Sequence, residues 1–258
     1  MKNPPTLRRR QALLASVLLP AVPWATAQGN PPRHYSVLSE LARELLVITF
    51  QPAVGSNLDA NLRQRMPIPG GLIDRTALTM AKAHIVAKEP VSRVSTFAPL
   101  DSDVFDSRQS FTDGSVAGMP PDLQDALRQQ GSSHLLLLSR FQGDTAIQFR
   151  DGKIGSGRME GLGFYIDNQT DVSRAGEGVG GRGFLAPFVY IRATVIDAAT
   201  GRVVRSRVYT RSTPVPASAG TESTHPWEAL NSTQKVRMLT EMLDEALRAV
   251  VPQALERG

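Results

Sequence analysis

The sequence predicts an α/β protein of the mixed α+β kind, with one mostly antiparallel sheet and helices packed on it, including a long C-terminal helix. Three patterns support this fold class. Two segments alternate apolar and polar residues around tight turns, Leu135–Leu138 is an apolar run of strand length, and residues 231–252 repeat apolar side chains at helical spacing. We expect a single domain over residues 35–258, long enough to bury a substantial core.

The first half of this domain begins with two strand-like segments. Leu45–Gln51 is rich in β-branched and aromatic residues, and we expect it to pair with Tyr35–Glu40 as a hairpin, with the turn near Ala42. A helix over Ser36–Leu46 is the competing interpretation, because this stretch also contains good helix formers. Prolines and glycines within 67–71 exclude a long regular element at that point.

Two helices and two strands follow. Asp74 is expected to cap a helix that runs to about Ala87, and Val91–Phe97 is expected to form a short strand. Residues 99–120 are polar and irregular. A second helix should open at Pro121 and end before Gly131, a residue type common just after helices. The run Leu135–Leu138 is then predicted to be a buried central strand.

The second half is more strongly β. Asp151-Gly152 separates residues 146–150 from 153–154, and such a dipeptide favours a two-residue hairpin turn. Residues 190–196 and 203–210 flank Asp197–Gly201, which predicts a second hairpin. Between the hairpins, residues 174–183 contain five glycines and are expected to form a flexible loop. Asn231 and Gln234 resemble a capping box that opens the C-terminal helix, with Pro252 marking its end.

A row of cations on the second hairpin is the candidate binding face. Alternation places Arg205, Arg207, Tyr209 and Arg211 on one side of their strand, and Arg192 lies across the hairpin. Arginines beside an aromatic ring can bind an anionic cell-surface polymer or the acidic face of an envelope protein. The alternative is that these charges keep an exposed strand soluble and unpaired.

The N-terminal 27 residues have the pattern of a cleavable export signal. A cationic start that includes Arg9 and Arg10 runs through Leu13 into a short apolar stretch, and Ala25 and Ala27 provide the small residues that signal peptidase requires. The arginine pair resembles the twin-arginine signal, with the general secretory route as the alternative. Without cysteine the signal cannot be a lipoprotein signal. We therefore predict a 28–34 linker and a mature protein in the periplasm, with no stable membrane span.

Composition excludes several classes of function. Residues 1–27 hold four of the 29 basic residues and no acidic ones, so the remaining 25 basic and 24 acidic residues carry a formal charge of +1. This near balance argues against nucleic acid as a partner. The absence of cysteine removes disulfides, thiol nucleophiles and every cysteine-containing metal site.

Short motifs add no catalytic chemistry, and we expect no catalytic, cofactor-binding or metal-binding residue. The glycines of 155–163 lead into another strand rather than a helix, which favours close packing in a sheet over nucleotide binding. The histidines do not form a zinc pair, and Asp101, Asp103 and Asp106 lack the offsets of a calcium loop. Ser133 and His134 are expected to point to opposite faces, because they are neighbours at the start of a strand.

The order of predicted elements, namely helix, glycine, buried strand, hairpin and C-terminal helix, is similar to that of a known family. Together with Asp197, Thr200 and Gly201 in the hairpin turn, residues 120–215 resemble an envelope family that includes the curli secretion channel protein, lipoprotein activators of penicillin-binding proteins and the N-terminal domain of the Tol-Pal translocation protein. The resemblance implies an α/β sandwich that binds other envelope components. It implies no catalytic residues.

These observations together predict a soluble, non-catalytic periplasmic binding domain that serves an envelope process. The alternative is a periplasmic hydrolase with an acid–base site at Glu160 and Asp167, which requires a deep pocket with buried carboxylates near Glu160. A third interpretation is a ligand carrier that uses the glycine loop as a lid.

Overall fold

A computed structural model describes most of the chain after Pro31. The described residues are 32–41, 43–52, 59–97, 119–149, 152–173, 180–217 and 225–256. The chain divides into two compact units, Met1–Pro31 and Pro32–Gly258, and all helices and strands named below belong to the second. The predicted signal motif, the cleavage residues Ala25 and Ala27, and the aspartates of 101–106 lie outside the described residues.

The described residues of this unit form one large sheet, a separate two-stranded hairpin and three α-helices, which confirms the predicted mixed α+β class. The helices are α1 (Leu72–Lys88), α2 (Pro121–Gln129) and α3 (Ser232–Ala254). The strands are β1 (His34–Glu40), β2 (Glu44–Thr49), β3 (Leu62–Pro67), β4 (Arg93–Phe97), β5 (His134–Arg140), β6 (Gln142–Asp144), β7 (Ile147–Phe149), β8 (Gly152–Ile154), β9 (Arg158–Ser173), β10 (Gly180–Asp197), β11 (Val203–Ser212) and β12 (Val215–Pro216).

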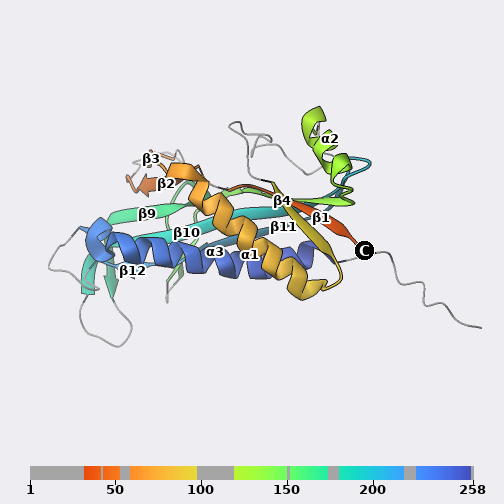
Figure 1. Cartoon of the computed structure of the whole chain (residues 1–258). Coiled ribbons are helices and arrows are strands. Elements are labelled where there is room, and N and C mark those ends of the chain that lie inside the picture. Colours follow the sequence, from red (N-terminus) through yellow and green to blue (C-terminus); the bar gives the residue numbers. More distant parts are fainter. Residues whose placement is uncertain are drawn as a thin grey trace, which may run out of the picture. The chain divides into compact units, whose positions relative to one another are not determined.

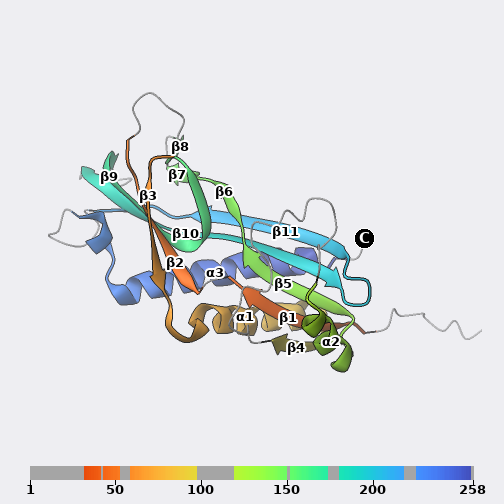
Figure 2. The ribbon, with the colours of Figure 1, turned by 90° about the horizontal axis from the view of Figure 1, so that it is seen from above.

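Strand β10 is the central strand of the sheet, and it pairs with four other strands (Figure 2). Along one edge it pairs antiparallel first with β9 and then with β5, and along its other edge with β12 and β11. Beyond β5 follow β1 and β4, and beyond β9 follow β2 and β3. The predicted hairpins β7–β8 and β10–β11 are both present, although the turn residue Asp151 lies outside the described residues.

The sheet is mixed, and the hairpin predicted for the first two strands is wrong. β1 pairs in parallel with both β4 and β5. β2 instead lies beyond β9 in the strand order, where it pairs antiparallel with β3 and parallel with β9. Five consecutive residues of β1, Tyr35–Ser39, are buried, as is typical of a strand covered on both faces. The helix α1 supplies the crossover that returns the chain in parallel beside β1.

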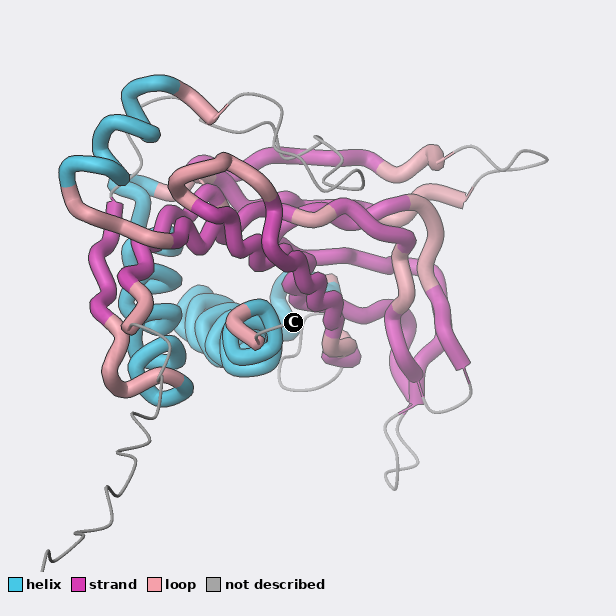
Figure 3. Tube along the Cα trace, turned by 90° about the vertical axis from the view of Figure 1, so that its right-hand side faces the viewer, coloured by secondary structure: helices cyan, strands magenta, loops and turns pink. Residues whose placement is uncertain are grey.

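Helices cover the two faces of the sheet unequally. Figure 1 and Figure 3 show α1 and α3 on one face, and α2 on the other. The core under α1 and α3 includes Val37, Leu138, Ile191 and Leu247, all fully or almost fully buried. The opposite face is covered near one end by α2 and near the other by the β7–β8 hairpin. The face under α1 and α3 is the one that contains the candidate site.

Local signals for the helices were mostly accurate. Leu135–Leu138 are fully buried, Gly131 has a φ of 64° just after α2, and Asn231 and Gln234 form the predicted capping box. α3 runs two residues beyond Pro252. The expected cap of α1 is wrong, because Gly71 occupies the N-cap and Asp74 lies inside the first turn.

The glycine-rich loop is shorter than predicted. Gly180–Gly183 belong to β10 and pair in part with β9, whereas residues 174–179 lie outside the described residues. Glycine composition indicated a loop, but main-chain hydrogen bonding between two long antiparallel strands extends through the last four positions.

Candidate functional site

An apolar groove lies between the N-terminal halves of α1 and α3. We call it the α1–α3 groove, and its volume is about 390 Å³. Figure 1 shows the two helices diverging toward their N-terminal ends, and farther along they meet where His84 Nε2, near the end of α1, lies 3.0 Å from a carboxylate oxygen of Asp244 in the middle of α3. The groove is lined mainly by apolar side chains, among them Leu45, Ile68, Leu72, Ile73, Val236 and Leu239. Its volume is within the usual range for small-molecule sites.

The two threonines of the groove add little polarity to its wall. The Thr76 hydroxyl donates to the Leu72 carbonyl at 2.9 Å, and the Thr240 hydroxyl donates to the Val236 carbonyl at the same distance. Each hydroxyl is therefore satisfied within its own helix. The groove consequently suits an apolar occupant.

Large apolar side chains gather at the mouth of this groove. Leu72 is 53% exposed and Val236 is 60% exposed, and both contribute to its lining. Met66 of the edge strand β3 is also exposed and pairs with Leu45 of the lining. Exposed apolar side chains that line a groove are typical of ligand-binding and interaction sites.

The predicted arginine face is divided between the two faces of the sheet. Arg211 pairs with Val189 and Arg207 with Ala193, so the row lies on the face covered by α3. Arg211 forms an ion pair with Glu245, and Arg205 lies 3.9 Å from Glu256. Hydrogen bonding to Tyr209 and the charge of Glu245 raise the pKa of Arg211 above its ordinary value.

Arg192 lies on the opposite face of the sheet and does not extend this row. It pairs with Val208, whose side chain is exposed on that face, and its guanidinium lies 5.2 Å from the centre of the Phe141 ring. Burial lowers the pKa of Arg192. The five predicted residues therefore do not form one surface.

The predicted acid–base pair is not assembled. Asp167 is buried and accepts hydrogen bonds from the Gln169 amide and from the amide and hydroxyl of Thr170 at 2.7–2.9 Å. Glu160 lies next to Arg140, at 4.0 Å from its Nε, beside a hollow of only about 20 Å³. Glu160 and Asp167 are seven positions apart on β9, a distance of roughly 23 Å along a strand. The hydrolase interpretation is wrong for this pair, because paired catalytic carboxylates lie much closer together.

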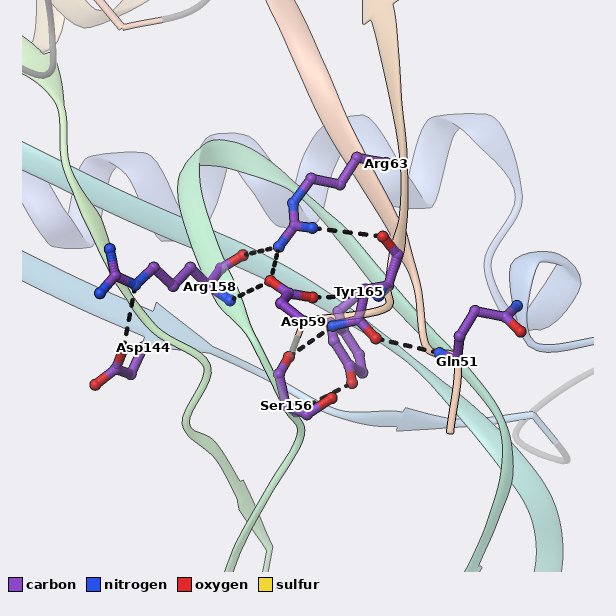
Figure 4. A network of polar contacts seen from close by, with 8 residues as sticks. Gln51, Asp59, Arg63, Asp144, Ser156, Arg158 and Tyr165 are labelled. Carbon is purple, nitrogen blue, oxygen red and sulfur yellow. Dashed lines mark hydrogen bonds and ion pairs between the residues drawn. The ribbon is translucent and has the colours of Figure 1, made fainter. Parts of the chain in front are cut away.

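A polar network fixes the start of β3 against the β8–β9 connection (Figure 4). Asp59 accepts hydrogen bonds from the Arg63 guanidinium and from the Asn61 and Arg158 amides. Burial raises the pKa of Asp59, but these bonds outweigh it and hold the pKa below its ordinary value. The Asn61 amide group donates to the Ser156 carbonyl at 2.7 Å, which joins the two segments.

This network explains part of the glycine cluster. A Cβ at Gly157, whose φ is +78°, would overlap the Asp59 carboxylate. At Gly163 a Cβ would overlap the Leu46 carbonyl. The predicted close packing of glycines in a sheet is therefore confirmed.

Ser133 and His134 meet, contrary to the expectation that they point apart. Ser133 Oγ lies 2.8 Å from His134 Nδ1, because Ser133 precedes β5 and is not held to strand alternation. The same oxygen lies 3.0 Å from the His34 amide and 3.2 Å from its carbonyl, so it joins the starts of β1 and β5. Burial, together with the charge of Arg33, lowers the pKa of His134.

The described residues show neither a metal centre nor a membrane-spanning helix. Among them, no group of three or more histidine or acidic side chains is placed to hold a metal ion. In that part of the chain no helix combines the length and apolarity required to cross a bilayer.

Comparisons with known proteins show no family. No family model and no curated protein matches the sequence. Among solved structures, the chain is similar to the PelC dodecamer from Paraburkholderia phytofirmans at 11% identity and a TM-score of 0.36, over 88% of this chain and 89% of that one. It is also similar to a putative neuraminyllactose-binding hemagglutinin homolog from Helicobacter pylori at 8% identity and a TM-score of 0.38, over 88% and 86%. Likenesses this distant carry no functional conclusion.

Sequence reasoning missed the groove. Its lining comes from β2, the segment before α1, β9 and the two long helices, which are far apart in the chain. One local signal was present: Val236 stands one turn before Leu239 and Thr240 at the beginning of α3, and it continues the apolar stripe to a position that is 60% exposed.

Proposed function

We propose that this protein is a non-catalytic periplasmic binding protein, and that the α1–α3 groove is its ligand site. The observation that supports the proposal is the groove itself, a volume of about 390 Å³ with apolar walls and exposed Leu72 and Val236 at its mouth. Burying such side chains against a ligand is favourable by about 25 cal/mol per Å² of apolar surface. A soluble protein that leaves this surface open therefore gains affinity by covering it.

The arginine row supports a binding role less well. Arg211 already faces Glu245 of α3, Arg205 faces Glu256 just beyond that helix, and Arg207 donates to the Ser206 carbonyl at 3.0 Å. An anionic polymer or an acidic partner protein would have to compete with these contacts. Such exposed ion pairs are individually weak, but they reduce the positive potential that the row offers.

The ligand site can be tested with a neutral, environment-sensitive dye such as N-phenyl-1-naphthylamine. We expect Leu72→Asp and Val236→Asp to weaken dye binding by roughly tenfold or more, because a charge at the mouth opposes burial of an apolar ligand. Val86→Asp and Val204→Asp are matched controls, since both valines are exposed but neither lines the groove. Equal losses in all four variants, with folding intact by circular dichroism, would show that the groove is not the dye site.

The proposed location rests on the N-terminal export signal. Expressed with a C-terminal tag in a Gram-negative host, the protein is expected in the periplasm with Gln28 as its first residue. Replacing Arg9 and Arg10 together by lysine is expected to block export if the twin-arginine route is used and to have little effect on the general route. Recovery of the chain from the cytoplasm with Met1 intact would contradict the proposal.

A further inference from the structure

We infer that the ligand of the α1–α3 groove is an anionic amphiphile, with its alkyl chain in the groove and its head group at Arg75. This inference rests on the proposed binding function and adds the chemical class of the ligand. Two independent features support it, the chemistry of the groove wall and the distribution of charge around its mouth.

The wall of the α1–α3 groove favours a ligand whose buried part has no polar atoms. Its two hydroxyls, on Thr76 and Thr240, are engaged with carbonyls of their own helices. A sugar, a nucleotide or a peptide backbone placed in the groove would lose hydrogen bonds to water and find few replacements on this wall. An alkyl chain loses none, and each methylene that leaves water contributes to affinity.

Arg75 is placed to hold the polar end of such a ligand. It stands three residues after Leu72, so the two side chains are neighbours on the surface of α1. Its guanidinium nitrogens lie 3.6 and 3.8 Å from the position that a Cβ would take at Gly70, immediately after Pro69 of the groove lining. The Arg75 guanidinium therefore lies at the end of the groove that is next to the start of α1.

The neighbouring acids leave this cation available. Asp74 is turned inward, with 1% of its surface exposed, and accepts hydrogen bonds from Ser39 and the Leu41 amide. Glu44 forms an ion pair with Arg65. Within the described part of the chain Arg75 has no ion pair. A guanidinium in this setting favours a carboxylate, sulfate or phosphate group over a cationic one.

On the opposite wall of the groove, the nearby arginine is already paired with an acid. Arg237, the residue after Val236 on α3, has its Nε 3.8 Å from the Glu241 carboxylate. Its charge is balanced locally, so Arg237→Gln is the matched control for a substitution of Arg75.

The test measures displacement of the neutral dye by single-chain ligands, each used below its micelle-forming concentration. Octyl, decyl and dodecyl sulfates are compared with alkyltrimethylammonium ions of equal chain length. We expect affinity to rise roughly fourfold per methylene for both series. At equal length, we expect the sulfates to bind about tenfold more tightly than the cations.

Two variants distinguish the ligand class from the site. Arg75→Gln is expected to remove most of the preference for sulfate while the increase with chain length persists, and Arg237→Gln is expected to leave both unchanged. If anions and cations bind equally, or if Arg75→Gln has no effect, the inferred ligand class is wrong although the groove still binds. If an amphipathic helical peptide displaces the dye and no alkyl ligand does, the inference is also wrong. If Leu72→Asp and Val236→Asp do not change the affinity for the dye, the proposed function is wrong instead.

Discussion

Gly163→Ala is expected to lower the free energy of unfolding by about 3 kcal/mol or more, a large effect for the addition of a single methyl group. Gly163 lies in β9 directly opposite Leu46 of the parallel neighbour β2. A Cβ at this position would overlap the Leu46 carbonyl and stand 2.8 Å from Phe188 Cζ. The carbonyl belongs to the backbone of a paired strand, so it cannot move without disturbing the pairing of β2 with β9.

Urea unfolding followed by circular dichroism measures this loss. Gly201→Ala is the matched control, because Gly201 has a φ of +67° but no atom within 4 Å of the added methyl group. That variant should cost only about 1–2 kcal/mol, the penalty of a left-handed alanine. The overlap argument is wrong if the two variants unfold at the same urea concentration.

Asp74→Ala is expected to lower the free energy of unfolding by about 2–4 kcal/mol. The Asp74 carboxylate lies under α1 and accepts hydrogen bonds from the Ser39 hydroxyl at 2.6 Å and the Leu41 amide at 2.8 Å. Removing it leaves two buried donors without an acceptor and opens a cavity against the core. The main contribution comes from the Leu41 amide, because a backbone donor cannot turn toward water.

Two further variants separate hydrogen bonding from volume and charge. Asp74→Asn keeps one acceptor oxygen and nearly the same size, so it should lose less than the alanine variant. Asp125→Ala removes an exposed carboxylate whose ion-pair partner among the described residues is Arg128, and a change within about 0.5 kcal/mol is expected. Thermal and urea unfolding of the three variants would refute the assignment if Asp74→Ala behaved like Asp125→Ala.

The elements that the sequence predicted well are those set by nearby residues. The β10–β11 hairpin follows from its turn, in which Asp197 accepts hydrogen bonds from the Ala199 and Thr200 amides and Gly201 adopts a positive φ. The start of α3 follows from the reciprocal bonds of Asn231 and Gln234. In both places the deciding contacts span four residues or fewer.

The misplaced elements depend on distant partners. Whether β1 pairs with β2 or with β5 is decided by burial on both faces of the sheet, which no local pattern of β1 reports. The side on which Arg205 and Arg211 lie depends on where α3 packs. Asp74 has a residue type suited to a helix cap, but the tertiary contact with Ser39 holds it inside the first turn instead. The α1–α3 groove could not be predicted for the same reason, because its lining residues are far apart in the sequence.

The parallel neighbours of β1 have a consequence for the order in which the molecule can assemble. The bond between His34 and Ser133 joins residues 99 positions apart, so β1 has no partner in β5 until the residues between them have been synthesised. Closing so long a loop slows the search for native pairing. During translation β1 can pair with β4 once residues 93–97 are available, but its other edge stays unpaired and open to chaperones until residues 134–139 follow.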